Sequence, residues 1–494
     1  MVRRLILAAA IAAVVLIVVL AGAAYWFLAR DGFRRALEAQ ASAWLGQPVT
    51  IGAASAQFLP RLAIQLRDIR VGDPVALALD DVELAADVRP LLDGRIENAD
   101  VLISDSRIDM PLPFELPRGG AADGSAGVAP PVRIVSVRSI ALRDVRLRSG
   151  GREIVVSADS SLDGTTLTLR RFTAEAGGTA LSVEGVVALA PRIDAQLMAT
   201  ANRLDVDELI ALANAFAPPA SGTSNAPGQS LRIVASIAAE QGTAGAIQVQ
   251  NLTTELTVDG ESISLSPLRF QMFDGRYEGA VTASLGTPLT ATIESRISDV
   301  DVAQLAAFGG SPDTVTGRLS GSGTFAGSGA DVAELLRAAR GEATASIVDG
   351  SIKRLQLVRT VVLFFGRPAP DAGEGSDRFE RLDAEFSLAN RVLRAGAFSL
   401  RSPDADMAGE GSLNLDTGAL DGRVDVLLSE ALSAQAGTDL YRYTREGNRV
   451  VLPASIGGTL AMPRLTINVA AAARRGLRNE VERRLKGLFD GLGR

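Results

Sequence analysis

Alternating apolar and polar residues are the feature that most constrains the fold of this 494-residue chain. A segment with a period of two buries one face as a β-strand and exposes the other face to water. Asp-Gly pairs such as Asp163-Gly164 and Asp259-Gly260 lie between the segments, and such pairs are typical of tight turns between antiparallel strands. The alternating segments are residues 64–71, 82–88, 166–172, 262–270, 412–415, 423–428 and 464–469. The pattern predicts a mainly β protein built from antiparallel meanders.

The alternating segments also form an internal repeat, in which each copy reads strand, strand, glycine, strand. The copies are residues 166–189, 262–285 and 392–415. Their shared glycines are Gly185, Gly279 and Gly411. A repeat of one meander unit predicts an elongated, curled sheet or groove assembled from similar modules.

Short amphipathic helices are expected between the modules. Asp205-x-x-Glu208 and Asp301-x-x-Gln304 have the form of a capping box, and a third helix is expected to begin at Asp331 and to end before Gly341. The first helix carries an apolar stripe at Leu209, Leu212, Ala213 and Phe216. Such a stripe could gate a hydrophobic channel, or it could simply cover one end of a sheet.

The N-terminal residues predict a membrane anchor. Residues 5–28 form an uncharged apolar run that exceeds the roughly 20 residues a helix needs to cross the hydrocarbon core. The residues expected within the bilayer are Leu5, Val14, Leu16, Ile17, Leu20, Trp26 and Leu28. A cleaved signal peptide is the alternative, because Ala21-Gly22-Ala23 has the small-x-small form of a cleavage site. Both interpretations place the rest of the chain outside the cytoplasm.

Two stretches rich in Gly, Pro, Ala and Ser, residues 118–131 and 217–229, cannot build a core and are expected to be loops or linkers. We place a module boundary at the second. The expected order is an anchor, an N-terminal β module, a linker, a C-terminal β module and a C-terminal helix. Their bounds are 1–30, 31–217, 218–229, 230–469 and 470–494.

The C-terminal helix is expected to be basic and amphipathic. Its apolar side would carry Leu477, Val481, Leu485, Leu488 and Leu492. A helix of this kind can lie on an anionic membrane surface. Docking on the sheet, or a partly disordered tail, is the alternative.

The composition excludes most enzyme classes. The chain has no histidine and no cysteine, which removes the commonest general base, thiolate chemistry, zinc clusters and disulfides. Lys353 and Lys486 are its only lysines, and neither stands in a phosphate-binding loop. The net charge of -7 offers no general attraction to nucleic acid. We therefore expect no enzyme, no cofactor, no metal and no nucleic-acid partner.

Two weaker motifs have simpler explanations than chemistry. Residues 317–329 contain Gly321-x-Gly323-x-x-Ala326, a variant of the dinucleotide fingerprint, but no helix begins in the same turn. A strand whose small residues permit close approach is expected there instead. Asp80-Asp81 and Asp404-x-Asp406 could serve as acid/base or calcium groups, yet each stands at a strand or turn and is expected to be solvated.

The chain resembles the AsmA family of Gram-negative envelope proteins. The segments that carry the resemblance are residues 44–73, 317–357, 378–428 and 451–469. They include a glycine-rich strand followed by a short helix, a Ser-Pro before a Gly-x-Gly strand, and a closing strand pair with the pattern Pro, Gly-Thr-Leu, Pro. Their order behind a single anchor is more specific than any one of them.

The resemblance implies an inner-membrane protein with one membrane pass and most of the chain in the periplasm. It implies a β-rich groove that holds or transfers phospholipid between membranes and supports outer-membrane biogenesis. Expected partners are membrane phospholipids and envelope proteins. A periplasmic scaffold or regulator of outer-membrane protein assembly, without lipid cargo, is the alternative.

If the protein has a groove, alternate apolar strand residues are the candidates for its lining, and each could equally be an ordinary core residue. The candidates are Leu66, Leu84, Leu167, Leu169, Ile263, Leu265, Leu413, Leu415, Val426 and Ile467.

Overall fold

The computed structural model describes most of the chain between residues 31 and 472. The described residues are 31–57, 61–87, 89–90, 95–112, 133–216, 231–352, 357–365, 377–436, 444–459, 461–468, 470–472, 474 and 481. The predicted anchor with all of its bilayer residues, the linker 218–229 and most of the C-terminal helix lie outside this set. Within it, no helix combines the length and the hydropathy needed to cross a membrane.

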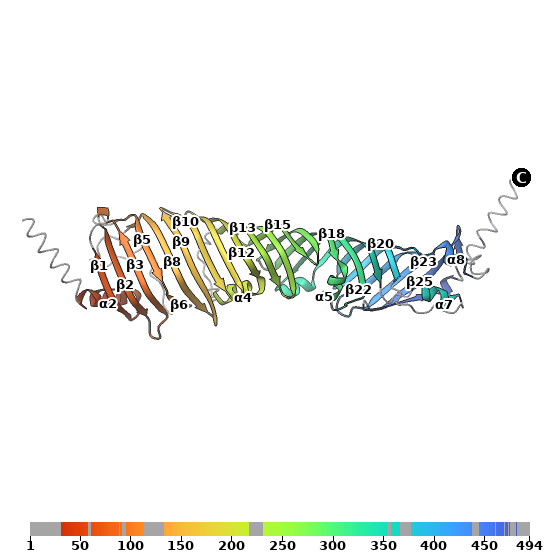
Figure 1. Cartoon of the computed structure of the whole chain (residues 1–494), viewed down its shortest axis with the longest axis horizontal. Coiled ribbons are helices and arrows are strands. Elements are labelled where there is room, and N and C mark those ends of the chain that lie inside the picture. The colour runs from red at the N-terminus through yellow and green to blue at the C-terminus, as the bar shows by residue number, and fades with distance from the viewer. Residues whose placement is uncertain are drawn as a thin grey trace, which may run out of the picture. The chain divides into compact units, whose positions relative to one another are not determined.

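The chain divides into two compact units, Met1–Gly245 and Ala246–Arg494, and each is mainly β (Figure 1). The first, called unit 1, contains α2 (Asp31–Leu45), β1 (Val49–Gln57), β2 (Leu62–Val71), β3 (Leu77–Ala86), β4 (Arg95–Ile96), β5 (Ala99–Ser104), β6 (Arg107–Met110), β7 (Arg133–Ile134), β8 (Ser136–Ser149), β9 (Arg152–Asp163), β10 (Thr166–Ala176), β11 (Thr179–Ala188), β12 (Ile193–Asp205), α4 (Val206–Phe216) and β13 (Leu231–Ala244).

The second unit, called unit 2, contains β14 (Ile247–Asp259), β15 (Ser262–Met272), β16 (Gly275–Ser284), β17 (Leu289–Asp301), α5 (Val302–Phe308), β18 (Val315–Gly329), α6 (Val332–Arg337), β19 (Arg340–Ile352), α7 (Leu357–Phe364), β20 (Asp377–Ala389), β21 (Val392–Arg401), β22 (Ala405–Asn414), β23 (Leu420–Leu428), α8 (Glu430–Ser433), β24 (Arg445–Glu446), β25 (Arg449–Thr459) and β26 (Met462–Ile467).

Unit 2 has the predicted antiparallel meander. Its strands pair with their neighbours in chain order from β14 to β23, and β23 then pairs with β25 and β25 with β26. Tight turns such as Asp259-Gly260 and Asp274-Gly275 join these strands, as the sequence predicts.

Unit 1 departs from a purely antiparallel meander in three places. β12 pairs with β13 in parallel, β5 and β6 both pair with β8 in parallel, and the short strands β4 and β7 form a separate parallel pair. Parallel neighbours cannot be joined by a hairpin and need a crossover connection, which commonly includes a helix. α4 lies in the first crossover, and both low-complexity stretches fall within crossover connections, so these stretches mark the places where the chain passes between parallel strands.

The repeat corresponds to the pairs β10–β11, β15–β16 and β21–β22. In each copy the shared glycine lies opposite the point where an extra residue interrupts the partner strand: Gly185 faces Leu169, Gly279 faces Leu268 and Gly411 faces Ala395. A Cβ at Gly185 or Gly279 would lie 2.1 or 2.2 Å from a carbonyl oxygen of the next strand. The glycine of the repeat therefore permits close approach of strands beside a bulge.

Bulges and single Asp residues let long strands keep their apolar side chains on one side of the sheet. Asp68 in β2, Asp144 in β8 and Asp299 in β17 have φ values of 52°, 51° and 57°, a left-handed conformation that Asp tolerates better than most residues. In β2 the residue pair Arg67-Asp68 is exposed, while Leu66 and Ile69 on either side join the same apolar cluster. The strict alternation predicted for residues 64–71 is therefore interrupted, and the interruption preserves the apolar face.

The three predicted helix starts are confirmed. The Asp205 carboxylate accepts a hydrogen bond from the Glu208 amide at 3.0 Å, and that of Asp331 accepts one from Glu334 at 2.7 Å. Asp301 accepts from the amides of Ala303 and Gln304. α4 lies against the β8–β9 turn, where Ser149 donates to the Ala215 carbonyl and Arg152 pairs with Glu208. These contacts fit a helix that covers one end of a sheet.

Candidate functional site

One face of the unit 1 sheet is apolar across all of its long strands. Residues paired across neighbouring strands point to the same side, so the register identifies continuous rows. One row consists of Ala54, Leu66, Val82, Ile103, Leu142, Ala158, Phe172, Val183, Ala199 and Ile237. A second consists of Ala56, Ile64, Leu84, Val101, Ile140, Ser160, Leu169, Gly185, Leu197 and Ala235. We call this surface the unit 1 apolar face.

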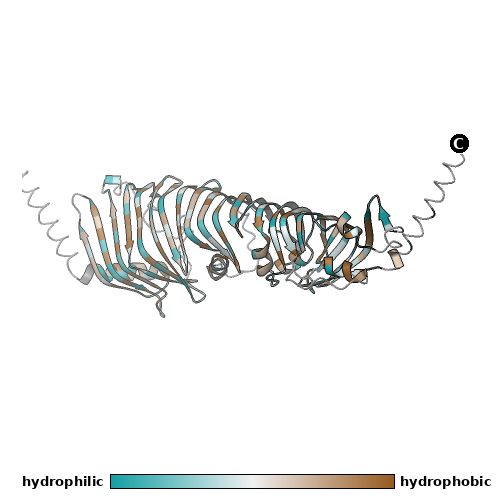
Figure 2. Ribbon diagram, turned by 45° about the vertical axis from the view of Figure 1, so that its right-hand side comes forward, coloured by the Kyte–Doolittle hydropathy of each residue, from teal (hydrophilic) through white to brown (hydrophobic). Residues whose placement is uncertain are grey.

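Unit 2 has an apolar face of the same kind. Its large side chains form a row made of Leu256, Leu265, Val281, Ile293, Phe325, Leu388, Leu393, Leu413 and Leu420, with Gly341 between Phe325 and Leu388. Brown and teal residues alternate along the strands in Figure 2, which shows the separation of apolar and polar sides. We call this surface the unit 2 apolar face.

A row of mostly small residues runs beside the large ones on the unit 2 apolar face. It consists of Gly279, Ser295, Gly323, Ala343, Phe386, Ala395, Gly411 and Gly422. Gly321 and Gly323, which could have belonged to a dinucleotide fingerprint, lie within β18, and this agrees with the strand that the sequence predicts. The small residues leave space above the sheet between larger neighbours.

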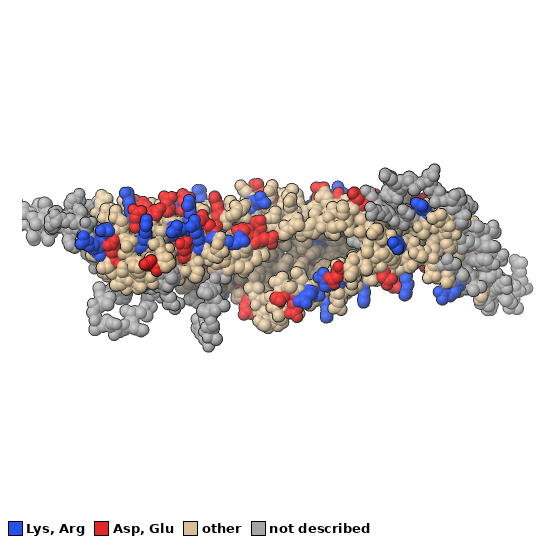
Figure 3. Space-filling view, turned by 90° about the horizontal axis from the view of Figure 1, so that it is seen from below, with Lys and Arg blue, Asp and Glu red and all other residues tan. Residues whose placement is uncertain are grey.

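That space includes a cavity of about 390 Å³, within the range of about 300–1,000 Å³ that is usual for ligand pockets. Its lining is almost wholly apolar and includes Val315, Ile347, Leu382, Phe386, Leu393, Phe398, Leu400, Leu413, Leu420 and Ile456. Figure 3 shows a hollow lined by uncharged residues around β18, with charged residues along its margins. The unit 2 apolar face is therefore accessible over part of its length.

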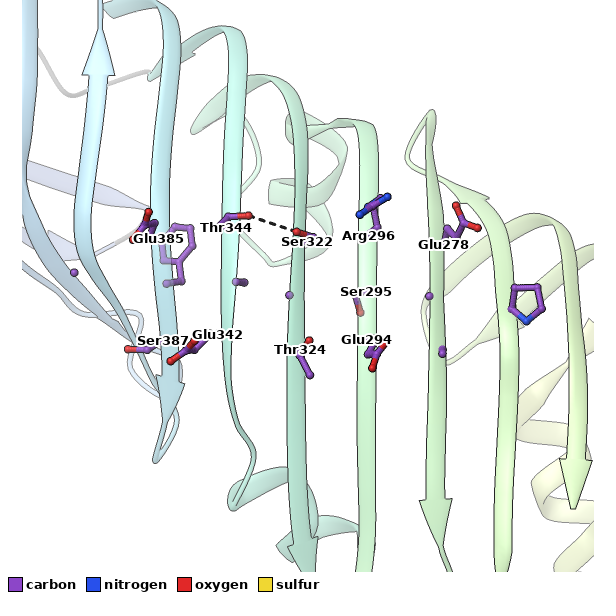
Figure 4. A pocket seen from close by; sticks show the side chains of 17 residues that line it. Glu278, Glu294, Ser295, Arg296, Ser322, Thr324, Glu342, Thr344, Glu385 and Ser387 are labelled. Carbon is purple, nitrogen blue, oxygen red and sulfur yellow. Dashed lines mark hydrogen bonds between the residues drawn. The ribbon is translucent and has the colours of Figure 1, made fainter. Parts of the chain in front are cut away.

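The opposite face of unit 2 is polar, and a shallow hollow of about 830 Å³ lies on it (Figure 4). One row across it consists of Glu278, Arg296, Ser322, Thr344 and Glu385, contributed by β16 to β20. These side chains are exposed, and Ser322 and Thr344 approach to 3.5 Å. Within the described chain, no group of three or more Asp, Glu, His or Cys residues could hold a metal ion. This face has the properties of a solvated sheet surface.

The displaced pKa values also belong to polar surfaces. Asp100 binds both Arg61 and Arg138; burial raises the pKa of its carboxyl, but the hydrogen bonds and charges of the two arginines outweigh burial and lower it. Hydrogen bonds from Asn98 and then Arg61 lower the pKa of Asp87. In unit 2, the Arg381 hydrogen bond lowers the pKa of Asp383. None of these carboxyl groups faces the apolar sides of the sheets.

The structure places the predicted lining residues in different surroundings. In unit 1, Leu66, Leu84, Leu167 and Leu169 share the apolar face, and Leu84 is 38% exposed. In unit 2, Ile263, Leu265 and Leu413 lie on the apolar face.

The other three predicted lining residues do not lie on the accessible face. Leu415 lies in the β22–β23 turn, at the edge of the sheet. Val426 is only 1% exposed, in a closed cluster, and Ile467 packs against the same cluster.

Sequence reasoning missed several cavity residues, among them Leu382, Phe386, Leu393 and Phe398. A signal for the first two was present, because residues 382–388 alternate strictly between apolar and polar types. Phe398 follows a bulge between Ala395 and itself, so simple alternation assigns it to the wrong face.

Each apolar face is closed at one end. In unit 1, α2 covers Val49, Ile51, Ile69, Val71 and Val82. In unit 2, α7 and α8 cover a cluster that includes Phe379, Met407, Val424, Val426, Leu428, Val450, Leu452 and Leu465. The faces are thus apolar surfaces with one sealed end each, and this arrangement defines a class of β-sheet proteins with a partly open apolar side.

Comparison with known families agrees with that class. Residues 231–397, from the start of β13 into β21, match the model of the AsmA family. This region, about a third of the chain, is that of an AsmA-family protein, in agreement with the resemblance seen in the sequence. No curated protein and no solved structure matches it.

Proposed function

We propose that this protein is a non-enzymatic carrier that holds phospholipid acyl chains on its apolar faces and passes them between membranes of the cell envelope, in support of outer-membrane biogenesis. The observation that carries the proposal is the apolar face of unit 2, which continues across its strands and stays open as a cavity of about 390 Å³. Membership of the AsmA family supports the same role.

The energetics suit an acyl chain. Each buried CH₂ contributes about 0.8 kcal/mol, so a single chain gains several kcal/mol from apolar contact alone. Such contact does not depend on a particular headgroup or on charged residues. The lining of the cavity is almost free of charged residues. Continuity of the rows across successive strands would let a chain move from one strand to the next without passing a polar barrier.

The proposal includes a location. The apolar run at residues 5–28 would anchor the chain in the inner membrane, with both β units in the periplasm and membrane phospholipids as the principal partners. Envelope proteins at the receiving membrane are further partners in this scheme. A scaffold for outer-membrane protein assembly without lipid cargo would instead need both faces of each sheet to be accounted for by packing or by water.

The test is mass spectrometry of lipid that residues 31–494 retain after secretion to the periplasm and purification without detergent. We expect bound phospholipid, and we expect Leu167→Asp and Leu265→Asp to reduce it at least fivefold, because a carboxylate on the apolar face has to be desolvated. Thr168→Asp and Ser264→Asp are the matched controls, since these neighbours point to the polar side.

Circular dichroism and thermal unfolding would confirm that all four variants keep the fold. A folded wild-type protein that carries no lipid would contradict the proposal and favour the scaffold. Equal loss of lipid in test and control variants would show that the effect does not come from the apolar face.

A further inference from the structure

Helix α7 occupies the apolar face of unit 2 beside its last strands (Figure 1). Leu357, Val361 and Val362 of α7 are buried in the apolar cluster at this end of the sheet, where α7 contacts β26 and α8 contacts β23 and β25. The strand residues of this cluster, such as Val424 and Leu452, belong to the same side of the sheet as the lining of the open cavity. α7 therefore sits where the apolar face would otherwise continue.

The open cavity ends at this helix. Several residues both line the cavity and pack in the α7 cluster: Ile347, Ile352, Leu382, Phe398, Leu400, Met407 and Ile456. Cavity and cluster are thus two parts of one apolar surface, one open and one filled by a segment of the chain itself.

Apolar packing is the main contact of α7 with the sheet. Its polar residues Arg359 and Thr360 make no side-chain hydrogen bond or ion pair with any other described residue. Arg359 and Leu363 are one helical turn apart, and both are exposed, Leu363 by 51%. Contacts of this kind are not directional, and acyl chains can replace them one for one.

We propose that α7 is a displaceable stopper, which fills the end of the groove in place of lipid and has to leave its seat before an acyl chain can reach the apolar cluster that α7 shares with β26 and its neighbouring strands. This inference rests on the proposed lipid-carrying function. It adds a closed state, in which cargo is held in the cavity, and an open state, in which cargo reaches the last strands.

The test uses the full chain, produced in cells with photo-leucine, a diazirine analogue close to leucine in size, and illuminated in its native membranes. Mass spectrometry then locates lipid adducts. Leu393 and Leu413 report on the open cavity, and Leu452, which is buried in the same cluster as α7, reports on the sealed end. In the wild-type protein we expect adducts at the first two and at least tenfold fewer at Leu452.

Two changes to α7 separate its buried and exposed sides. Val361→Asp places a carboxylate in the cluster and should unseat the helix, which would raise Leu452 adducts at least fivefold. Leu363→Asp is the matched control on the exposed side of the same helix and should leave the distribution unchanged.

A disulfide staple tests the opposite change, in which α7 is fixed in its seat. We would introduce a pair of cysteines, one in α7 and one in β26, and select facing positions by screening for complete oxidation. Because the chain contains no cysteine of its own, no other thiol can react. Oxidation should reduce Leu452 adducts below the wild-type level, and reduction should restore them. The staple also keeps the proposal falsifiable if Val361→Asp does not fold.

Equal labelling of Leu452 in the oxidised and reduced staple would overturn the stopper. Unchanged labelling in Val361→Asp, when hydrogen exchange shows that α7 has left its seat, would also overturn it. An absence of adducts at Leu393 and Leu413 in every form would instead contradict the lipid-carrying function itself.

Discussion

The helices α2 and α7 each cover the end of an apolar face, but different forces hold them. α7 is held by apolar side chains. α2 also buries apolar residues, and in addition its side chains bond the backbone of β1: Glu38 accepts from the Ile51 amide at 2.8 Å, and Ser42 accepts from the Val49 amide at 2.9 Å. Arg34 donates to the Ile51 carbonyl at 3.0 Å.

This difference gives the two ends different properties. The amides and carbonyls of an edge strand can pair with another chain unless something satisfies them. The polar side chains of α2 do so for β1, which fixes the helix in one position and protects the edge. The buried contacts of α7 are made by apolar side chains, and such contacts do not fix a hydrogen-bonding register.

The largest expected effect comes from the core beneath α7. Leu452 is fully buried, so Leu452→Ala should destabilise unit 2 by about 2–5 kcal/mol, from lost burial and the cavity left behind. Hydrogen exchange of unit 2 peptides, followed with denaturant, would measure the loss. Leu84→Ala on the open face of unit 1 is the control and should cost about 1 kcal/mol, because that side chain is partly exposed already.

Comparable costs at the two positions would contradict the distinction between an open face and a sealed end. A small loss at Leu452 would mean that the cluster under α7 is looser than its burial indicates.

A smaller effect should distinguish the two helices by their polar side chains. Glu38→Ala removes a charged acceptor from the Ile51 amide, and hydrogen bonds to charged groups contribute about 1.5–3 kcal/mol. Exchange of the Ile51 amide should accelerate by a corresponding factor. Arg359→Ala in α7 should change nothing measurable, because its side chain bonds to no other described residue.

Gln40→Ala controls for the loss of a polar residue from α2, since Gln40 is exposed. If Arg359→Ala destabilises its helix as much as Glu38→Ala does, the two ends do not differ in how they are held.

The sequence predicts the strands, the repeat and the helix starts well because each depends on local chemistry. Alternation identifies β10 and β15, and single Asp residues identify the starts of α4, α5 and α6. The face of a residue is harder to predict wherever a bulge changes the phase. Leu169 and Phe172 lie on one face although three positions separate them.

The sealed ends could not be predicted from local patterns at all. Val426 and Leu265 both stand in alternating strands, yet Val426 is buried in the cluster under α7 and α8, and Leu265 lies on the open face. The covering helix is distant in sequence from β25 and β26, so only the tertiary fold determines which apolar residues remain accessible. The parallel pairing of β12 with β13 was missed for the same reason.

The smallest expected effect concerns acid stability, which should also distinguish the two ends. The folded pKa of Asp100 is lowered by Arg138 and Arg61 despite burial. Its contribution to stability is therefore present above the unfolded pKa of about 3.9 and is lost as pH falls through the lower folded value. Hydrogen exchange between pH 2 and 6 should show β3, β5 and β8 opening in acid, while the apolar cluster under α7 changes little.

Asp100→Asn should remove this acid step, since the amide cannot titrate, at the cost of a weaker interaction with Arg61 and Arg138 near neutral pH. Asp80→Asn, at an exposed position in β3, serves as the control and should leave the step in place. An acid step that persists in Asp100→Asn would assign the pH dependence to other carboxyl groups. If the α7 cluster instead opens in the same pH range, a titrating group also holds that end, and packing alone does not explain its seat.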